Sequence, residues 1–450
     1  MKNLHTTLIV FLTINITISF THDISQEKPK VIVLTDIGGD PDDEQSMVRL
    51  LLYSNELDLQ AICVTSRLGH GQDIKPEILE NQIKAYGKTY PNLIKHSPEF
   101  PTSGYLLSII KEGQGNQHDI GEGFDTEASN AIINIVDKSK AIINIPVWGG
   151  LRELAQALWK YEQDHSPDEV KAFCQKIRVH SIGDQDKHRD YILSNFPHIG
   201  FIADAFAFFG QFGIREISAF RGMYMTGDQS LQNADWVREN VHNHGALSNT
   251  YPLSGHGTNG MKEGDSPSFL GLISNGLHDP DRPEWGGWGG RFRLLKNCLY
   301  IDAQDFLNGE LNERHTVSRW RPTFQKDFMA RLDWCIKEPE YANHNPIVSV
   351  NGHQDPTPMI LSIQPGKTVS LDASESRDPD GDRLIFNWFI YEEISGNIPF
   401  TGKITSDGQN CQFTIPEDFS GKEIHLILEV LDSGNPALTG YKRIVFQIND

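Results

Sequence analysis

The sequence predicts an α/β domain on an open, mainly parallel sheet with helices on both faces, followed by an all-β sandwich. Two observations lead to this fold class. Up to Trp334, apolar runs of strand length alternate with segments of helical periodicity, and such alternation is typical of a parallel sheet covered by helices. Beyond Trp334 the runs are short, rich in β-branched and aromatic residues and separated by Gly, Pro, Asp and Asn, as in a β-sandwich.

The first predicted unit is a strand, a helix and a second strand. The strand "VIVLT" precedes a helix that places Met47, Val48, Leu51 and Leu52 on one face. The run "LDLQAICVTS" then supplies the second strand. The same alternation recurs further along the chain, in "KAIINIPVW", "LRELAQALWKYEQ", "KIRVHSI" and "HIGFIA". We expect this α/β domain to span residues 23–338.

The C-terminal part is predicted to be a sandwich of residues 345–450. The segment before it, "KEPEYANHNP", is polar and contains proline, as linkers do. Strands are expected in "KTVSLDAS", "RLIFNWFIY", "CQFTI", "EIHLILEVLD" and "YKRIVFQI". The segment "SRDPDGDR" resembles the strand start of PKD-like and cadherin-like sandwiches, where Asp378, Asp380 and Asp382 would either bind calcium or form a tight turn.

The N-terminus predicts export. Met1-Lys2-Asn3 is followed by a mostly apolar stretch from Leu8 to Phe20, which is too short to cross a bilayer and fits a signal peptide of residues 1–21. We therefore expect a periplasmic or extracellular protein without a membrane span. The net charge of -20 argues against a nucleic-acid partner, which would select clustered Lys and Arg. Five cysteines without CxxC spacing indicate neither a zinc site nor a disulfide framework.

The stretch "LTDIGGDPDDE" places five carboxylates within nine residues directly after the first strand. Asp40 as N-cap and Pro41 as first helical residue explain part of it as a helix start, but this leaves Asp36 and the glycine pair unexplained. In open α/β sheets, ligands bind beyond the carboxyl ends of the strands. Converging carboxylates repel one another unless a cation joins them, and an all-oxygen ligand set favours Ca²⁺ or Mg²⁺ over zinc.

This arrangement resembles the N-terminal signature of nucleoside hydrolases. In that family a strand ends in Thr-Asp-x-Gly, and two aspartates open the next helix. The acidic residues bind a calcium ion that holds the attacking water and the sugar hydroxyls. The resemblance implies that Asp36 is a calcium ligand and general base, Asp42 a sugar-hydroxyl contact and Asp43 a bidentate calcium ligand. A two-residue insertion between Gly38 and Asp42 departs from the signature and leaves the role of Asp40 open.

Two further segments bear on the calcium shell. "VWGGLRELAQAL" resembles a family segment in which a main-chain carbonyl is a ligand, here that of Arg152. The last ligand is either Asp265 in "MKEGDSPSFL" or Asp279 in "GLHDPDRP". We favour Asp265, because the sequence from there onward resembles nucleoside hydrolase-like bacterial proteins described as cellulose-binding, in "EGDSPSFL", "PEWGGWGGRF" and "RWRPTFQKDFMARLDWC". This resemblance covers essentially the whole mature chain.

The proton donor for the leaving group is not evident. With Asp265 as ligand, Gly264 stands where the family has its histidine, so Glu263 or His256 would have to supply the proton. A carboxyl in an apolar pocket can have a pKa suited to that role.

Four other residues are candidate substrate contacts. Trp285 and Trp288, set among glycines, either stack on sugar rings or belong to the core, and Arg291 could bind hydroxyls or carboxylates. Asp186 in "GDQDKHRDY" either lines the pocket or belongs to an acidic turn.

Together these features predict an exported, calcium-dependent hydrolase of N- or O-glycosidic bonds in a carbohydrate or nucleoside-like substrate. An oligomer is compatible with the sequence. The alternative is a non-catalytic polysaccharide-binding protein on the same fold, which would need no proton donor opposite Asp36.

Overall fold

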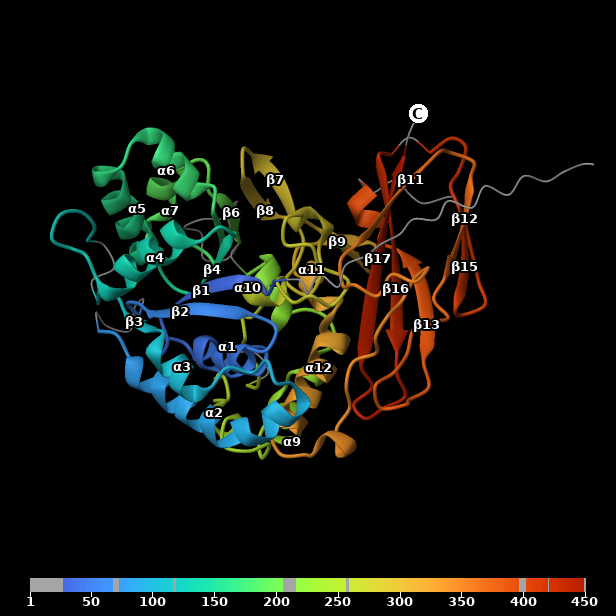
Figure 1. The fold of residues 1–450 in the computed structure, drawn as a ribbon, viewed down its shortest axis with the longest axis horizontal. Coiled ribbons are helices and arrows are strands. Elements are labelled where there is room, and N and C mark those ends of the chain that lie inside the picture. The colour runs from blue at the N-terminus through green and yellow to red at the C-terminus, as the bar shows by residue number, and fades with distance from the viewer. Residues whose placement is uncertain are drawn as a thin grey trace, which may run out of the picture.

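The computed structural model describes residues 27–67, 73–115, 119–204, 216–255, 259–395, 402–419 and 421–448. The predicted signal peptide of residues 1–21 lies outside these ranges. Within them the predicted fold class is confirmed: a large, mainly parallel sheet carries helices on both faces, and two smaller sheets follow at the C-terminal end (Figure 1). No helix in the described ranges is long and apolar enough to cross a membrane.

The large sheet has eight strands in the order β3-β2-β1-β4-β5-β6-β8-β7, parallel throughout except that β7 runs antiparallel to β8. From β1, the chain adds β2 and β3 on one side of the sheet and then β4, β5 and β6 on the other side. The order of the strands therefore reverses between β1 and β4. The strands are β1 Lys30–Thr35, β2 Asp58–Val64, β3 Ile110–Glu112, β4 Ile143–Val147, β5 Ile177–Ser181, β6 Gly200–Ala203, β7 Phe292–Lys296 and β8 Leu299–Asp302.

Alternating residues of β1 reach two different cores, as strand geometry requires. Val31 and Val33 belong to the core under α1, α2 and α12, whereas Ile32 and Leu34 belong to the core under α4 and α5 (Figure 1). The helices are α1 Pro41–Leu52, α2 Pro76–His96, α3 Ser103–Ser108, α4 Glu127–Lys138, α5 Arg152–Asp164, α6 Pro167–Cys174, α7 Arg189–Asn195, α9 Ala234–Asn240, α10 Pro267–Leu270, α11 His315–Ser318 and α12 Arg321–Trp334. A short hairpin of β9 Asp305–Leu307 and β10 Glu310–Asn312 precedes α11.

The C-terminal sheets enclose a core of their own, as a sandwich requires. One sheet has the order β11-β17-β16-β13 and the other β12-β15-β14. Asp378 accepts hydrogen bonds from the amides of Asp380 (2.9 Å) and Asp382 (3.0 Å), so this segment is a tight turn. The strands are β11 Met359–Ile363, β12 Thr368–Asp372, β13 Ile385–Ile390, β14 Lys403–Ser406, β15 Asn410–Thr414, β16 Glu423–Leu431 and β17 Thr439–Ile448.

The sandwich is joined to the α/β part by a continuous core. Tyr391 and Tyr441 belong to the same buried cluster as Trp288 and Trp320. The guanidinium of Arg443 on β17 is fully buried and donates to the carbonyls of two residues in the loop after α10, Leu277 (2.9 Å) and Gly286 (3.0 Å). The two parts therefore share apolar and polar contacts.

Candidate metal centre and substrate site

The acidic loop lies at the carboxyl end of β1, on the edge of the sheet where β4 and β5 also end. Gly38 adopts a positive φ of 86°, which allows the sharp turn before α1 begins at Pro41. The hydroxyl of Thr35, the last residue of β1, donates to Asp43 Oδ1 and accepts from the amide of Ile37 (3.2 Å). This hydroxyl ties the first turn of the helix to the strand and fixes where Asp43 points.

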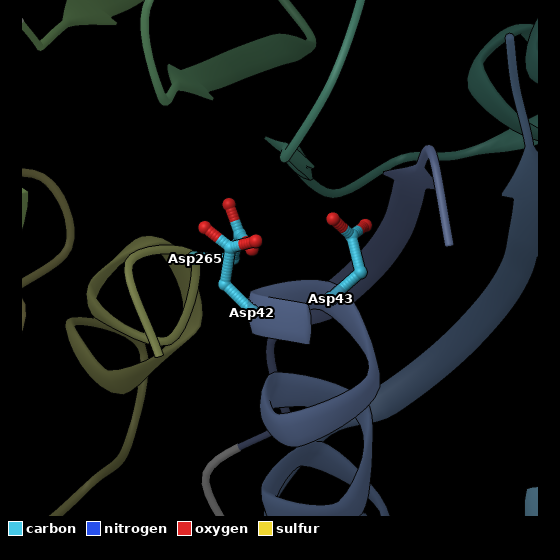
Figure 2. Close-up of side chains that lie close together, drawn as sticks. All are labelled: Asp42, Asp43 and Asp265. Carbon is cyan, nitrogen blue, oxygen red and sulfur yellow. The ribbon is translucent and has the colours of Figure 1, made fainter. Parts of the chain in front are cut away.

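Three carboxylates converge beyond this strand end. Asp42 and Asp43 extend from the first turn of α1, and Asp265 comes from the segment just before α10 (Figure 2). One carboxylate oxygen from each lies within 4.8 Å of the other two, with Asp43 and Asp265 buried and Asp42 half-buried. Asp279 instead lines a different cavity, beside Arg178. The structure therefore brings Asp265, and not Asp279, to the acidic loop.

The electrostatics of this cluster fit a bound cation. Burial raises the pKa of Asp43 well above its usual value, and the charges of Asp36, Asp265 and Asp42 raise it further. Burial also raises the pKa of Asp42, although Lys262 opposes that shift. Each of these carboxylates therefore opposes the ionisation of the others, and a nearby positive charge relieves that repulsion. A hard divalent cation such as Ca²⁺ suits a set of clustered carboxylate oxygens.

Two glycines at the end of β4 let carboxylates approach the site. A Cβ at Gly149 would lie 2.4 Å from Asp36 Oδ1, and a Cβ at Gly150 would lie 2.2 Å from Asp186 Oδ2. Asp36 and Asp186 therefore lie directly against the backbone of this glycine pair. Asp36 is 5% exposed. Among the neighbouring charges, that of Asp36 raises the pKa of Asp43 most. The glycines of "VWGGL" thus have a steric role in assembling the site.

Asp186 is held at the start of α5. Its Oδ2 accepts from the amide of Arg152 (2.7 Å), and its Oδ1 accepts from the amide of His188 (3.3 Å). The Arg152 side chain donates to the carbonyl of Asp119 (2.6 Å) and to Glu153 Oε1 (2.8 Å). The side chain of Arg152 thus organises the surrounding loops, and the metal-ligand role of its carbonyl stays a prediction.

A small cavity of about 10 Å³ includes Gly150 and Asp186 in its lining. Ser66 Oγ and Gln114 Oε1 are buried there and have no hydrogen-bond partner within the described ranges. Hydroxyl groups of a ligand can bind to such atoms. Among the described residues, the lining consists of Thr65, Ser66, Gln114, Gly150, Arg152, Glu153, Gln185 and Asp186.

Of the two predicted proton donors, Glu263 and His256, only Glu263 lies in the described ranges. Glu263 is fully buried and forms an ion pair with Arg49, whose Nη2 lies 3.1 Å from Oε1. Its carboxylate also accepts from the hydroxyls of Tyr251 (2.7 Å) and Ser266 (2.7 Å). These contacts speak against Glu263 as the proton donor, because its carboxylate pairs with a guanidinium and does not lie in an apolar pocket. His256 lies outside the described residues.

The glycine at the family's histidine position is closely packed. A Cβ at Gly264 would lie 3.1 Å from a ring carbon of Phe220 and 3.4 Å from Asp42 Oδ2. Phe220 therefore occupies space that a larger side chain at this position would need.

The prediction that Trp285 and Trp288 stack on sugar rings is wrong. Trp285 and Trp288 are each 1% exposed. Trp288 packs edge-on against Tyr441, and Trp285 packs edge-on against His425, so both indoles lie under the sandwich. Arg291 likewise is buried and pairs with Asp305, with Nε 2.8 Å from Oδ1. Of the two interpretations of these tryptophans, the core interpretation is correct.

Lys262 is a site residue that the sequence did not reveal. Its ammonium lies 2.7 Å from Asp40 Oδ2 and 3.6 Å from Asp42 Oδ2. Asp40 does occupy the N-cap position of α1, but its side chain makes no capping hydrogen bond. The expectation that Asp40 caps the helix is thus corrected: its carboxylate binds a lysine.

Comparisons with known proteins agree with this architecture. Residues 30–292 match the family model described as "Cellulose-binding Sde182, nucleoside hydrolase-like domain", and residues 368–448 match "Cellulose-binding protein Sde0182, C-terminal domain". A solved structure from Saccharophagus degradans is described as a nucleoside hydrolase-related protein associated with carbohydrate metabolism. It is 34% identical, with a TM-score of 0.79, over 94% of this chain and 100% of its own.

Some other known proteins are less similar to this chain. A plant nucleoside hydrolase is 15% identical, with a TM-score of 0.36, over 68% of this chain and 99% of its own. No curated protein gives a significant match.

Proposed function

Because the chain belongs to the family of cellulose-binding Sde182 proteins with a nucleoside hydrolase-like domain, we propose that it is a calcium-dependent hydrolase of N- or O-glycosidic bonds. The observation that carries this proposal is the convergence of Asp42, Asp43 and Asp265 at the strand ends. The substrate is a carbohydrate or a nucleoside-like glycoside, and the family description favours a carbohydrate. Export to the periplasm or the cell exterior is part of the same proposal.

Asp43 and Asp265 are the residues best placed to hold the cation, with Asp36 and Asp42 beside them. Bound calcium would orient sugar hydroxyls and lower the pKa of a water ligand. The carboxylate of Asp36, whose position is fixed by contact with Gly149, would accept a proton from the attacking water. Asp42, which is only half-buried, lies within reach of the same cation and also accepts hydrogen bonds from sugar hydroxyls.

The chain's own charges and polar atoms also act on the reacting sugar. The buried carboxylates stabilise positive charge that develops on the ring in an oxocarbenium-like transition state. Ser66, Gln114 and Asp186 line a small neighbouring cavity of about 10 Å³, which has room for one further hydroxyl. Because Glu263 is locked to Arg49, we expect substrates whose leaving group departs with little protonation to react fastest.

The Arg49–Glu263 pair also favours a second candidate function, a non-catalytic polysaccharide-binding protein. Binding a sugar through a cation and a polar cavity requires no proton donor, whereas hydrolysis of an ordinary alkyl glycoside does. The same site residues would then recognise hydroxyls without cleaving the bond.

One experiment separates the two candidates. Nitrophenyl glycosides and nucleosides are tested with the wild type, with Asp43→Asn and with the matched control Asp279→Asn, each in calcium and in chelator, beside a cellulose sedimentation assay. Hydrolysis by the wild type and the control, lost in chelator and in Asp43→Asn, supports the enzyme. Calcium-dependent sedimentation without hydrolysis supports the binder. Hydrolysis unchanged by both chelator and Asp43→Asn refutes the calcium mechanism.

A further inference from the structure

The proposed mechanism leaves the role of Lys262 unexplained. This lysine is only 7% exposed, and its ammonium lies 3.6 Å from Asp42 Oδ2 in the acidic cluster. Burial alone would lower the pKa of Lys262, but Asp42 and Asp40 outweigh burial and the pKa is raised. The charged form of this side chain is therefore favoured next to the proposed metal ligands.

The backbone around Lys262 is fixed to α1. The amide of Lys262 donates to Gln45 Oε1 (2.6 Å), and Gln45 Nε2 donates to the carbonyls of Pro252 (2.8 Å) and Gly260 (3.1 Å). Gln45 is fully buried and follows directly after the acidic residues of the helix start. The ammonium is thus anchored to the same helix that carries Asp42 and Asp43, and only its flexible side chain can move.

The ammonium lies between two carboxylates of different kinds. The Asp40 side chain is 49% exposed and is the nearer partner, at 2.7 Å. The Asp42 side chain is 16% exposed, belongs to the converging set, and is 3.6 Å from the ammonium. A divalent cation that binds Asp42 has to share this carboxylate with the ammonium, and the two positive charges repel each other.

We propose that Lys262 is a tethered cation that competes with the metal ion for Asp42 and so sets the affinity of the site, while Asp40 restrains it. The inference rests on the proposed function, because it concerns the same cation. In the metal-free protein the ammonium offsets part of the charge of the cluster. When the metal binds, the ammonium gives up Asp42 and keeps its salt bridge to Asp40. Lys262 is thus a positioning residue for the metal site.

The test is a calcium titration by isothermal calorimetry on the full chain and on Lys262→Met, Asp40→Asn and the double variant, at constant ionic strength. Lys262→Met keeps the apolar stem and removes the charge, and should tighten calcium binding about tenfold. Asp40→Asn removes the restraint on the ammonium and should weaken binding about tenfold. In the double variant Asp40→Asn should cost only about twofold, because no ammonium remains to be released.

The matched control is Lys442→Met on β17. Lys442 is another buried lysine, at 1% exposure, and its ammonium binds the carbonyl of Asp355 (2.6 Å). Its loss should leave calcium affinity unchanged.

The outcomes separate this inference from the proposed function. If the wild type binds calcium but Lys262→Met binds no tighter, or the two substitutions are additive, the inference is overturned and the calcium mechanism stands. If no form of the protein binds calcium, both are overturned. If Lys262→Met does not fold, as judged by circular dichroism, Asp40→Asn still decides, because binding that is unchanged or tighter in that variant overturns the inference.

Discussion

The acidic cluster should destabilise the protein whenever no cation is bound, so Asp43→Asn should be more stable than the wild type in a chelator. Asp43 is 3% exposed and lies within 4.8 Å of two other carboxylates. Two unit charges at that separation repel by about 3.5 kcal/mol at an effective dielectric constant of about 20. Proton uptake relieves most of this repulsion, so we expect a gain of about 1–2 kcal/mol.

The pH dependence of this effect follows from the raised pKa of Asp43. A carboxyl whose pKa is higher in the folded than in the unfolded state binds its proton more tightly when folded. Its stabilising contribution is therefore present at low pH and is lost as the pH rises through the folded pKa. In chelator, the wild type should lose stability as the pH rises above 3.8, the ordinary pKa of an aspartate. Asp43→Asn should lose less.

Thermal unfolding followed by circular dichroism, in chelator and in calcium at pH 5 and pH 8, checks this prediction. Asparagine retains an acceptor for the Thr35 hydroxyl. The control is Asp305→Asn, because Asp305 is equally buried but pairs with Arg291 and Arg319. This control should lose about 3–5 kcal/mol in both conditions. If Asp43→Asn is destabilised in chelator as the control is, the carboxylates do not repel one another and the reasoning is refuted.

Three further substitutions test other parts of the site and fold. Gly149→Ala should weaken calcium binding and activity at least tenfold, because a Cβ would lie 2.4 Å from Asp36 Oδ1; calorimetry and glycoside assays measure this. Glu263→Gln should cost about 3–5 kcal/mol in urea unfolding, because it leaves a fully buried guanidinium without its partner. The hydrogen bond to Asp333 raises the pKa of His244 above 6.5. This pair therefore stabilises the protein fully below pH 6.5, and its contribution is lost as the pH rises through the pKa of the folded state. His244→Gln should remove this step from the dependence of melting temperature on pH.

Each of these predictions has a contradicting outcome. Gly255 has open space where a Cβ would stand, so Gly255→Ala is the harmless control, and equal calcium affinity in the two glycine variants would remove Asp36 from the site. If Glu263→Gln has normal stability but no activity, Glu263 is the proton donor after all. If His244→Gln and the wild type show parallel pH profiles, the pair with Asp333 contributes no stability.

The sequence was sufficient for the fold class and for the family, because both depend on local signals. Periodicity of apolar residues distinguishes helices from strands without reference to the rest of the chain. The acidic residues after the first strand were recognisable because capping a helix does not require Asp36. The comparisons confirm the family resemblance, and the structure brings Asp42, Asp43 and Asp265 together.

The remaining features depend on contacts between distant parts of the chain. Trp285 and Trp288 among glycines have the same composition whether they form an open platform or a core, and only the position of β16 and β17 decides between them. Glu263 gave no sign that Arg49 would neutralise it. Likewise nothing near Asp40 in the sequence indicated that Lys262 would be its partner.

The buried Arg443 links the C-terminal sandwich to the part of the chain that carries the proposed metal site. The carbonyls of Leu277 and Gly286, which accept hydrogen bonds from this guanidinium, lie in the loop after α10, and Asp265 lies just before α10. A mechanical path therefore runs from β17 to a proposed metal ligand. The sandwich therefore supports the site and is not a module joined by a flexible linker, so deleting it should disrupt the site. A polymer bound by one part would also have a fixed orientation relative to the other.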